Sequence, residues 1–305
     1  MEKFFKVAER GSNPAQEFRA GITTFLAMAY IIAVNPALLA AAGVPISAAI
    51  TATCLGGGIM TILMGLFSNR PLACASGMGV NAVVAFSLTP ITGGDWHASM
   101  AVIFIEGVAI LLLVLCGLRE AIMDAIPVNL RHAISVGLGL FIAMIGLKNS
   151  GIIVANESTL VALGDIFSPS FIVGVISIVA TVVLYSARVK GSLLIGIILA
   201  VLAGIPLGVT ASPTGIVSGL DFSTFGAPFL TDEAGVMGIV RALTTPVLLV
   251  FAFSLMMSDF FDTMGSAMAI AKQGDFLTED GNVKDIKQIL IVDSAAAAAG
   301  GLFGA

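Results

Sequence analysis

The sequence feature that most constrains the fold is a series of long apolar runs. A membrane-spanning helix needs about 20 mostly apolar residues, because the hydrocarbon core of a bilayer is about 30 Å thick. Nine runs are candidate spans: 21–42, 46–67, 71–90, 98–117, 130–148, 170–187, 191–209, 243–271 and 286–305. The third is short and interrupted by glycine, and the eighth contains two acids. We therefore expect an all-α polytopic membrane protein.

Composition supports this class. Hydrophobic residues make up 58% of the 305 residues and charged residues only 11%, whereas a soluble domain carries roughly 25% charged residues. The net charge of −5 includes no basic tract, so nucleic acid is not an expected partner. The three cysteines lie in apolar stretches without paired spacing, and neither histidine has acids at ligand spacing. We expect no metal, no disulfide framework and no cofactor.

The basic residues predict an orientation. Cytoplasmic loops of membrane proteins carry an excess of lysine and arginine. With a cytoplasmic N-terminus, twelve basic residues fall on the cytoplasmic side and two, Lys148 and Arg241, on the other. The twelve are Lys3, Lys6, Arg10, Arg19, Arg70, Arg119, Arg131, Arg188, Lys190, Lys272, Lys284 and Lys287. The segment 1–20 is polar and mixed in charge, so it is not a cleavable signal and is expected to be cytoplasmic.

The loop 210–242 is the longest break between spans and is expected to be extracytoplasmic. Seven candidate spans precede it and two follow. Residues 119–129 read as a surface or interfacial helix. The sequence stops inside an apolar run, and no polar tail follows the ninth span, so we expect it to be truncated there.

Four acids lie inside candidate spans: Glu106, Asp259, Asp262 and Asp293. No lysine or arginine lies centrally in a span to pair with them. Intramembrane acids are costly and usually functional, and desolvation favours their protonated form. Asp259 and Asp262 are three residues apart and share a helix face. One can bind substrate while the other is structural or proton-linked, or both can simply bond neighbouring helices; for Glu106 and Asp293 a structural hydrogen-bonding role is favoured.

The third span is broken by proline, glycines and small residues between Pro71 and Ala82. Irregular backbone at membrane depth is tolerated only where it lines an enclosed cavity, and broken helices form substrate sites in transporters. Asn81 adds a donor and an acceptor. The alternative is a close helix crossing through small residues, which is the favoured reading for Gly56–Gly57–Gly58 in the second span.

The first span contains Thr23, Thr24 and the dipeptide Asn35–Pro36. A threonine hydroxyl in a helix either faces a site or bonds back to the preceding turn, and the sequence leaves both open. Asn35–Pro36 is expected to end or kink the helix.

Three segments together resemble the adenine/guanine/hypoxanthine permeases, a branch of the nucleobase–ascorbate transporter superfamily. Residues 23–36 (TTFLAMAYIIAVNP) resemble the first span of these permeases, 73–82 (ACASGMGVNA) the third and 259–265 (DFFDTMG) the eighth. Asp293 and the closing glycines resemble the ninth span. The likeness extends from about residue 10 to the end of the sequence.

The resemblance implies a fourteen-helix fold of two inverted seven-helix repeats, in which a core domain moves against a gate domain. Core spans 1–4 would occupy 21–117, gate spans 5–7 would occupy 118–209, and core spans 8 and 9 would occupy 243–305. The third span would pair a short extended strand with a half-helix. The protein would lie in the cell membrane, and superfamily members often dimerise through the gate domain.

The resemblance also implies a function: secondary import of hypoxanthine, adenine or guanine with protons, without enzymatic activity. Asp262 would hydrogen-bond the base and carry coupling with Asp259. Met78 and Gly79 would present backbone to the base, Asn81 would follow at the half-helix, and Thr24 would form a wall. Ser266 stands where the branch usually has threonine, and the tenth span, with the second binding acid of the family, is absent.

Other functions remain open at this stage. A transporter of another nucleobase, xanthine or uracil, would share these motifs. An anion permease of the same fold would have to bind an anion beside acids. An intramembrane aspartyl protease needs aspartates on two helices, whereas Asp259 and Asp262 share one. A simple channel fits broken helices with unpaired acids less well than alternating access does.

Overall fold

The computed structural model describes residues 2–9, 11–118, 128–189, 191–210, 219–232, 235–274, 277 and 283–305. Six helices in these ranges are long and apolar enough to cross a membrane: Pro14–Ala41, Ile46–Ser68, Trp96–Leu115, Pro169–Ser186, Pro246–Met268 and Ile286–Phe303. The polytopic helical class is therefore confirmed. The count of nine spans and the inverted repeat stay predictions, and most of the expected interfacial helix at 119–129 lies outside the described residues.

The chain divides into two compact units, which are described separately. The first contains residues 1–30 and 139–218, and the second contains residues 31–138 and 219–305. The boundary runs through one long helix, α9 (Val128–Asn149).

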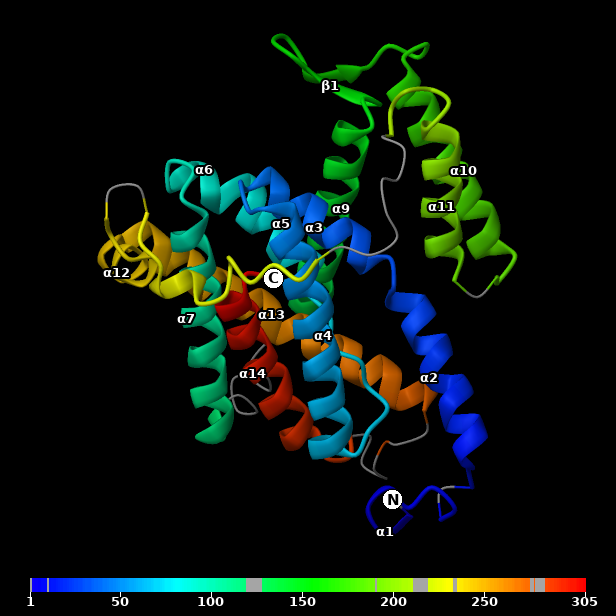
Figure 1. Ribbon diagram of the computed structural model, residues 1–305, viewed down its shortest axis with the longest axis vertical. Helices are drawn as coiled ribbons and strands as arrows, with labels where there is room; N and C mark the ends of the chain where they lie inside the picture. Colours follow the sequence, from blue (N-terminus) through cyan, green and yellow to red (C-terminus); the bar gives the residue numbers. More distant parts are fainter. Residues whose placement is uncertain are drawn as a thin grey trace. The chain divides into compact units, whose positions relative to one another are not determined.

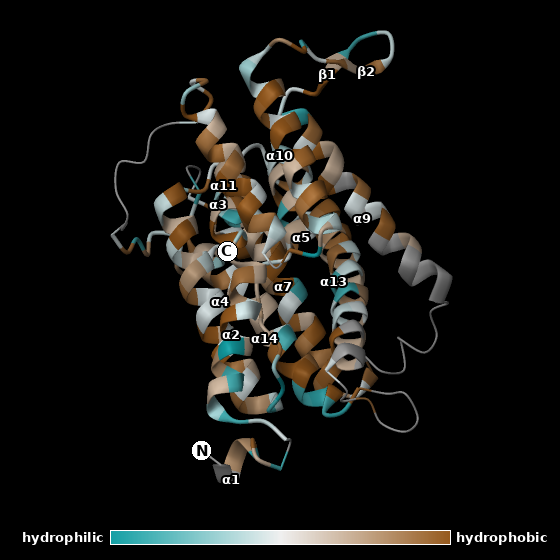
Figure 2. Cartoon of the chain, turned by 90° about the vertical axis from the view of Figure 1, so that its right-hand side faces the viewer, coloured by the Kyte–Doolittle hydropathy of each residue, from teal (hydrophilic) through white to brown (hydrophobic). Residues whose placement is uncertain are grey.

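The first unit consists of exposed apolar helices and one hairpin. It holds α1 (Glu2–Phe5), α2 (Pro14–Met28), α10 (Pro169–Ser186) and α11 (Ser192–Gly204). Helix α10 packs on α11, and Gly196 makes this possible because a Cβ there would lie 1.9 Å from Thr181 Oγ1. Most side chains of both helices are hydrophobic (Figure 2), yet few are buried. Such surfaces suit a bilayer, not water.

The hairpin pairs β1 (Ile153–Asn156) with β2 (Leu160–Leu163) in antiparallel register, with Ile153 opposite Leu163. The hairpin lies between the fifth and sixth candidate spans, 130–148 and 170–187. Asn156 Oδ1 accepts hydrogen bonds from the backbone N–H groups of Ser158 (2.9 Å) and Thr159 (3.0 Å). This side-chain turn reverses the chain between two short β-branched segments.

The second unit contains the buried core. Its helices are α3 (Ile31–Ala41), α4 (Ile46–Ser68), α5 (Met78–Val83), α6 (Thr89–Ile91), α7 (Trp96–Leu115), α12 (Gly238–Thr244), α13 (Pro246–Gln273) and α14 (Ile286–Phe303), with a π-helical turn at Val84–Leu88 and a 3₁₀ turn at Ala227–Phe229. Helix α14 packs between α7 and α4, and α13 packs against α7 (Figure 1). The last part of the expected loop 210–242 is thus helical.

The first candidate span differs from expectation in where it breaks. The helix is interrupted at Ala29–Tyr30, between α2 and α3, and then continues through Asn35–Pro36 to Ala41. The helix therefore does not end at Asn35–Pro36, which lies inside α3, and the alternative of a kink there stays a prediction. Asn35 is fully buried, and its side chain bonds neighbouring segments. A polar residue expected to stop a helix instead connects the helix to its surroundings.

The third candidate span is non-helical from Pro71 to Gly77 and helical from Met78. Met78 and Gly79, expected in an extended strand, form the first turn of α5, and no strand pairing involves the described segment before them. Thr61 of α4 supports the irregular backbone, because its Oγ1 lies 3.0 Å from both the N–H and the C=O of Cys74. A side chain thus pairs backbone groups that lipid could not satisfy.

A polar cluster joins α12 to the turn before α7. Arg241 donates to Asp95 Oδ2 (3.2 Å), Asp232 Oδ2 (3.0 Å) and the carbonyl of Thr92 (2.8 Å). Asp95 also caps α7 by accepting from the backbone N–H of His97 at 2.9 Å. One of the two basic residues predicted for the non-cytoplasmic side is therefore engaged with acids of its own unit.

Candidate functional site

The second unit encloses a cavity of about 250 Å³. Helices α4, α5, α7, α13 and α14 contribute to its lining, together with the non-helical residues 72–77. The break in the third span therefore borders a cavity, as irregular backbone at membrane depth requires.

All four intramembrane acids line this cavity. We call Glu106 of α7, Asp259 and Asp262 of α13, and Asp293 of α14 the acid wall. Among the described residues that line the cavity there is no lysine, arginine or histidine. The arrangement can accept hydrogen bonds from N–H donors and can bind protons, and it repels anions.

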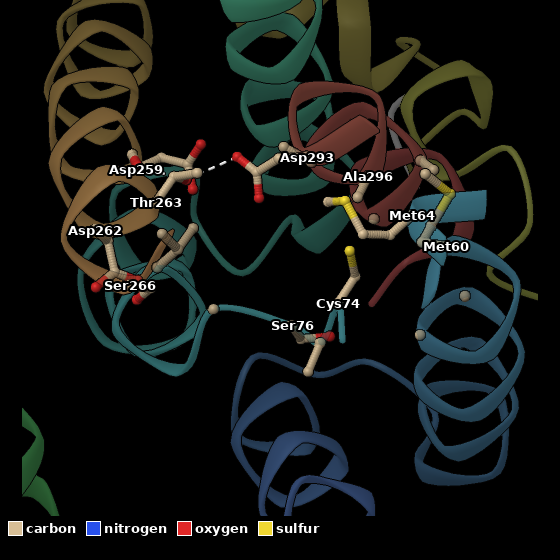
Figure 3. Close-up of a pocket in the computed structure, with 18 of the residues that line it drawn as sticks. Met60, Met64, Cys74, Ser76, Asp259, Asp262, Thr263, Ser266, Asp293 and Ala296 are labelled. Atoms are coloured by element: carbon tan, nitrogen blue, oxygen red, sulfur yellow. Dashed lines mark hydrogen bonds between the residues drawn. The ribbon is translucent and has the colours of Figure 1, made fainter. Parts of the chain in front are cut away.

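The facing side has no ionised group. Its residues come from α4 and the non-helical segment, and we call them the apolar wall: Gly56, Gly57, Met60, Met64, Leu72 and Cys74. Figure 3 shows Asp259, Asp262, Thr263 and Ser266 on one side of the pocket and Met60 and Met64 on the other. Methionine is polarisable and adapts to a flat ligand face.

The four acids differ in accessibility. Asp262 is exposed, Asp259 and Asp293 are half-buried, and Glu106 is only 2% exposed. Asp293 Oδ2 lies 2.7 Å from the Thr263 hydroxyl, which also lies 3.0 Å from the carbonyl of Asp259 (Figure 3). The most accessible carboxyl is thus that of Asp262, the acid that the sequence favoured for ligand contact.

A buried network supports Asn81, which also lines the cavity. Asn81 Nδ2 donates to Asn35 Oδ1. Asn35 Nδ2 in turn donates to Thr53 Oγ1 (2.8 Å) and Ser76 Oγ (3.2 Å). The sequence analysis treated Asn35 only as a residue that ends or kinks a helix. Its amide in the middle of an apolar run was the available signal that it makes buried hydrogen bonds. Asn35 fixes the Asn81 amide and the Ser76 hydroxyl at the edge of the cavity.

The other predicted site residues lie elsewhere. Met78 and Gly79 do not line the cavity, although the preceding Gly77 does. Thr24 is in α2, which belongs to the first unit. Its neighbour Thr23 donates back to the Arg19 carbonyl at 3.0 Å, which is the local reading that the sequence left open. The structure therefore brings Asp262, Asp259 and Asn81 together with Glu106 and Asp293.

Helices α7 and α14 cross in backbone contact beside the acid wall. A Cβ at Gly107 would lie 2.2 Å from the backbone nitrogen of Ala298, and one at Gly301 would lie 2.5 Å from that of Phe104. Gly56 and Gly57, expected to form a packing surface, have only ordinary contacts at 3.7 and 3.5 Å, and Gly58 has none within 4 Å. This backbone crossing thus places Glu106, next to Gly107, on the helix packed against the helix of Asp293.

Comparison with known proteins places these features in a family. The model of a permease family matches residues 15–305. The chain is 38% identical over 304 residues to the putative permease MJ0326 of Methanocaldococcus jannaschii, covering 100% of this chain and 68% of the relative. It is 34% identical to the adenine permease AdeP of Escherichia coli (100% and 66% covered) and 37% identical to the guanine/hypoxanthine permease PbuG of Bacillus subtilis (100% and 70% covered).

The chain thus spans about two thirds of the length of these relatives. The family match covers both units of the structure and every residue of the acid wall. The chain belongs to the permease family.

Proposed function

We propose that this chain forms the larger part of a secondary active transporter that imports purine nucleobases, namely hypoxanthine, adenine or guanine, together with protons. Relatives that match the whole chain are named adenine permease and guanine/hypoxanthine permease. The observation that carries the proposal is the cavity, whose lining includes the exposed Asp262, the non-helical residues 72–77 and, on the side opposite Asp262, Met60 and Met64.

The chemistry of a purine suits this cavity. A purine is flat and carries ring N–H donors and nitrogen or oxygen acceptors on its edges. The Asp262 carboxylate accepts from the donors in charge-assisted bonds, while Asn81 supplies a donor and an acceptor. The apolar wall covers the ring face. Asp259 lies one helical turn from Asp262 and modulates its charge or braces α13.

The remaining site assignments are part of the proposal. Met78 and Gly79 present backbone to the base and Thr24 forms a wall in another state of the transport cycle, since alternating access changes which residues face the ligand. Asp293 braces α14 through its bond with Thr263. No cofactor other than the coupling proton takes part.

The proposed architecture is a fourteen-helix inverted repeat. The core domain takes residues 21–117 and 243–305 from this chain, and the gate domain takes residues 118–209 and forms a homodimer interface. The N-terminus lies on the cytoplasmic side of the cell membrane. The support for the orientation is the distribution of basic residues, twelve against two.

Replacing Asp262 with asparagine tests the function. In the full-length protein, Asp262→Asn should weaken hypoxanthine binding by about ten- to a hundredfold, because a buried ligand donor loses a charged acceptor. Binding of radiolabelled hypoxanthine is measured by equilibrium dialysis of purified protein. Asp259→Asn is the matched control and should lose less, since the same chemical change falls on a less accessible carboxyl.

Competition with unlabelled compounds distinguishes the alternatives. Hypoxanthine, adenine and guanine should displace the label better than xanthine, uracil or sulfate. If xanthine or uracil displaces it best, the substrate class is wrong. If Asp262→Asn binds like wild type while Asp259→Asn does not, the roles of the two acids are reversed.

A further inference from the structure

Glu106 is the most deeply enclosed member of the acid wall. Its side chain is 2% exposed and lines the cavity, and its Oε2 is buried without a hydrogen-bond partner in the described part of the chain. The structural hydrogen-bonding role that the sequence favoured for Glu106 thus lacks a bond at this oxygen. The other three acids are half-buried or exposed.

The groups that face Glu106 are negative or neutral. Asp259 of α13 and Asp293 of α14 interact with it electrostatically. The non-helical segment contributes the Cys74 thiol, which lies near Asp293. Described cavity residues of α4 and α5 carry no titratable group: Gly56, Gly57, Met60, Met64, Val80 and Asn81.

An ionised Glu106 would therefore be poorly compensated. Removing a carboxylate from water costs several kcal/mol, as a rough scale, unless a cation or donors replace the lost hydration. Neither replaces it among the described cavity residues, and two further carboxyls add repulsion. Protonation removes the charge and turns one oxygen into a donor, so a neutral Glu106 is compatible with its surroundings.

We propose that Glu106 binds the coupling proton of transport and that Asp262 serves the ligand. This proposal rests on the proposed function and reassigns the proton from Asp262 and Asp259. In the loading step, a hydronium ion in the cavity breaks one of its O–H bonds and the proton forms an O–H bond with a Glu106 carboxylate oxygen. In the release step, the proton returns to water on the other side of the membrane.

Protonation of Glu106 can be coupled to purine movement because it changes the net charge of the cavity. The cavity has four carboxyl groups and no cation in its described lining. If all four were ionised, movement of the core domain would move this negative charge within the membrane. Moving one elementary charge across a membrane potential involves about 2.3 kcal/mol per 100 mV. A proton on Glu106 lowers the negative charge by one and removes repulsion from Asp259 and Asp293, so the wall can close on a bound purine.

The test separates coupling from binding. Full-length wild type and Glu106→Gln are reconstituted in liposomes, and radiolabelled hypoxanthine is followed in two assays. One is accumulation against a gradient, driven by an inward proton gradient of about one pH unit, which supports about tenfold accumulation with one proton. The other is exchange at equal concentrations, measured from about pH 5 to 8.

Glutamine mimics the protonated acid. We expect Glu106→Gln to lose the roughly tenfold accumulation yet to exchange hypoxanthine within about twofold of wild type, with a flat pH profile. Glu106→Asp keeps a titratable group and should restore accumulation. Glu157→Gln, at an exposed position in the hairpin turn, is the matched control and should behave as wild type.

Two outcomes overturn the proposal. One is Glu106→Gln accumulating hypoxanthine with wild-type pH dependence. The other is Glu106→Gln and Glu106→Asp both losing exchange and hypoxanthine binding while remaining monodisperse, which would make Glu106 part of the binding site. If wild type neither binds nor exchanges hypoxanthine, the proposed function fails whatever Glu106 does.

Discussion

The acid wall and the apolar wall line the same cavity but are built differently. The acid wall places four carboxyls on three long helices, α7, α13 and α14. The apolar wall comes from α4 and a non-helical segment and has no ionised group. The asymmetry suggests that a ligand is recognised by its polar edge on one side and by its ring face on the other. The proposed proton binding at Glu106 would take place on the acid wall.

The two walls are also held in place by different forces. Behind the acid wall, α7 and α14 meet backbone to backbone at Gly107 and Gly301, which leaves no room for adjustment. Next to the apolar wall, three hydrogen bonds hold an irregular segment: Thr61 donates to the Cys74 carbonyl, Asn35 donates to Ser76, and Asn81 donates to Asn35. We expect substitutions at the α7–α14 crossing to affect folding and substitutions in the hydrogen-bond network of the irregular segment to affect binding.

The largest effect should come from Gly107→Ala. Its Cβ would lie 2.2 Å from the Ala298 nitrogen, which is main chain and cannot rotate away. Overpacking of this kind costs about 1–3 kcal/mol and occasionally more, and we expect the upper end. The thermal unfolding midpoint of purified protein, followed by loss of the monodisperse chromatographic peak, measures this.

The matched control is Gly58→Ala on α4, where a Cβ meets nothing within 4 Å. Alanine is favoured over glycine in a helix interior by up to about 1 kcal/mol, so this variant should unfold at the wild-type temperature or above. Equal destabilisation by the two variants would show that the α7–α14 crossing is not the tight support described here.

A smaller effect is expected from Asn35→Leu on the other side of the cavity. The amide of Asn81 loses its acceptor and the Ser76 hydroxyl loses a donor. An unsatisfied buried polar group costs about 1–3 kcal/mol, and part of this should appear as about tenfold weaker hypoxanthine binding. Equilibrium dialysis of the folded variant measures the affinity.

Thr53→Val provides the comparison for Asn35. It removes a hydroxyl that accepts from Asn35 but leaves the Asn35–Asn81 bond in place. Its affinity should stay within about threefold of wild type, which is under 1 kcal/mol. Wild-type affinity in Asn35→Leu, or an equal loss in Thr53→Val, would mean that Asn35 does not position Asn81.

The sequence predicted features whose signals are strong and local. Intramembrane acids stand out against an apolar background, so all four were found before their convergence in one cavity was visible. Proline and glycine at residues 71–79 predicted the break in the third span. Helix α5 begins at Met78, which is earlier than expected. Backbone breakers and acids within apolar runs can be recognised from the neighbouring residues of the sequence, without knowledge of distant partners.

Features that depend on distant partners were missed. Asn35 was predicted only to end or kink its helix. Its hydrogen bonds run to residues 18 and 41 positions further along the chain, so they cannot be seen in the local sequence. A single Gly107 in an apolar helix gave no sign of a backbone crossing with α14. The break at Ala29–Tyr30 has neither proline nor glycine, and the hairpin at 153–163 forms through an asparagine turn within a polar loop. Asn35 and Gly107 reflect tertiary context overriding local preference, whereas the hairpin is a local turn signal that was overlooked.

The most direct test of the central claim is the position of a bound purine. Crystals of the full-length protein grown with a bromine-substituted hypoxanthine would give an anomalous difference peak at the ligand. The account predicts the peak inside the cavity, with the purine edge on the Asp262 carboxyl and its ring face against Met60 or Met64. A peak outside this cavity, or a purine bound within it with no contact to Asp262, would contradict the account.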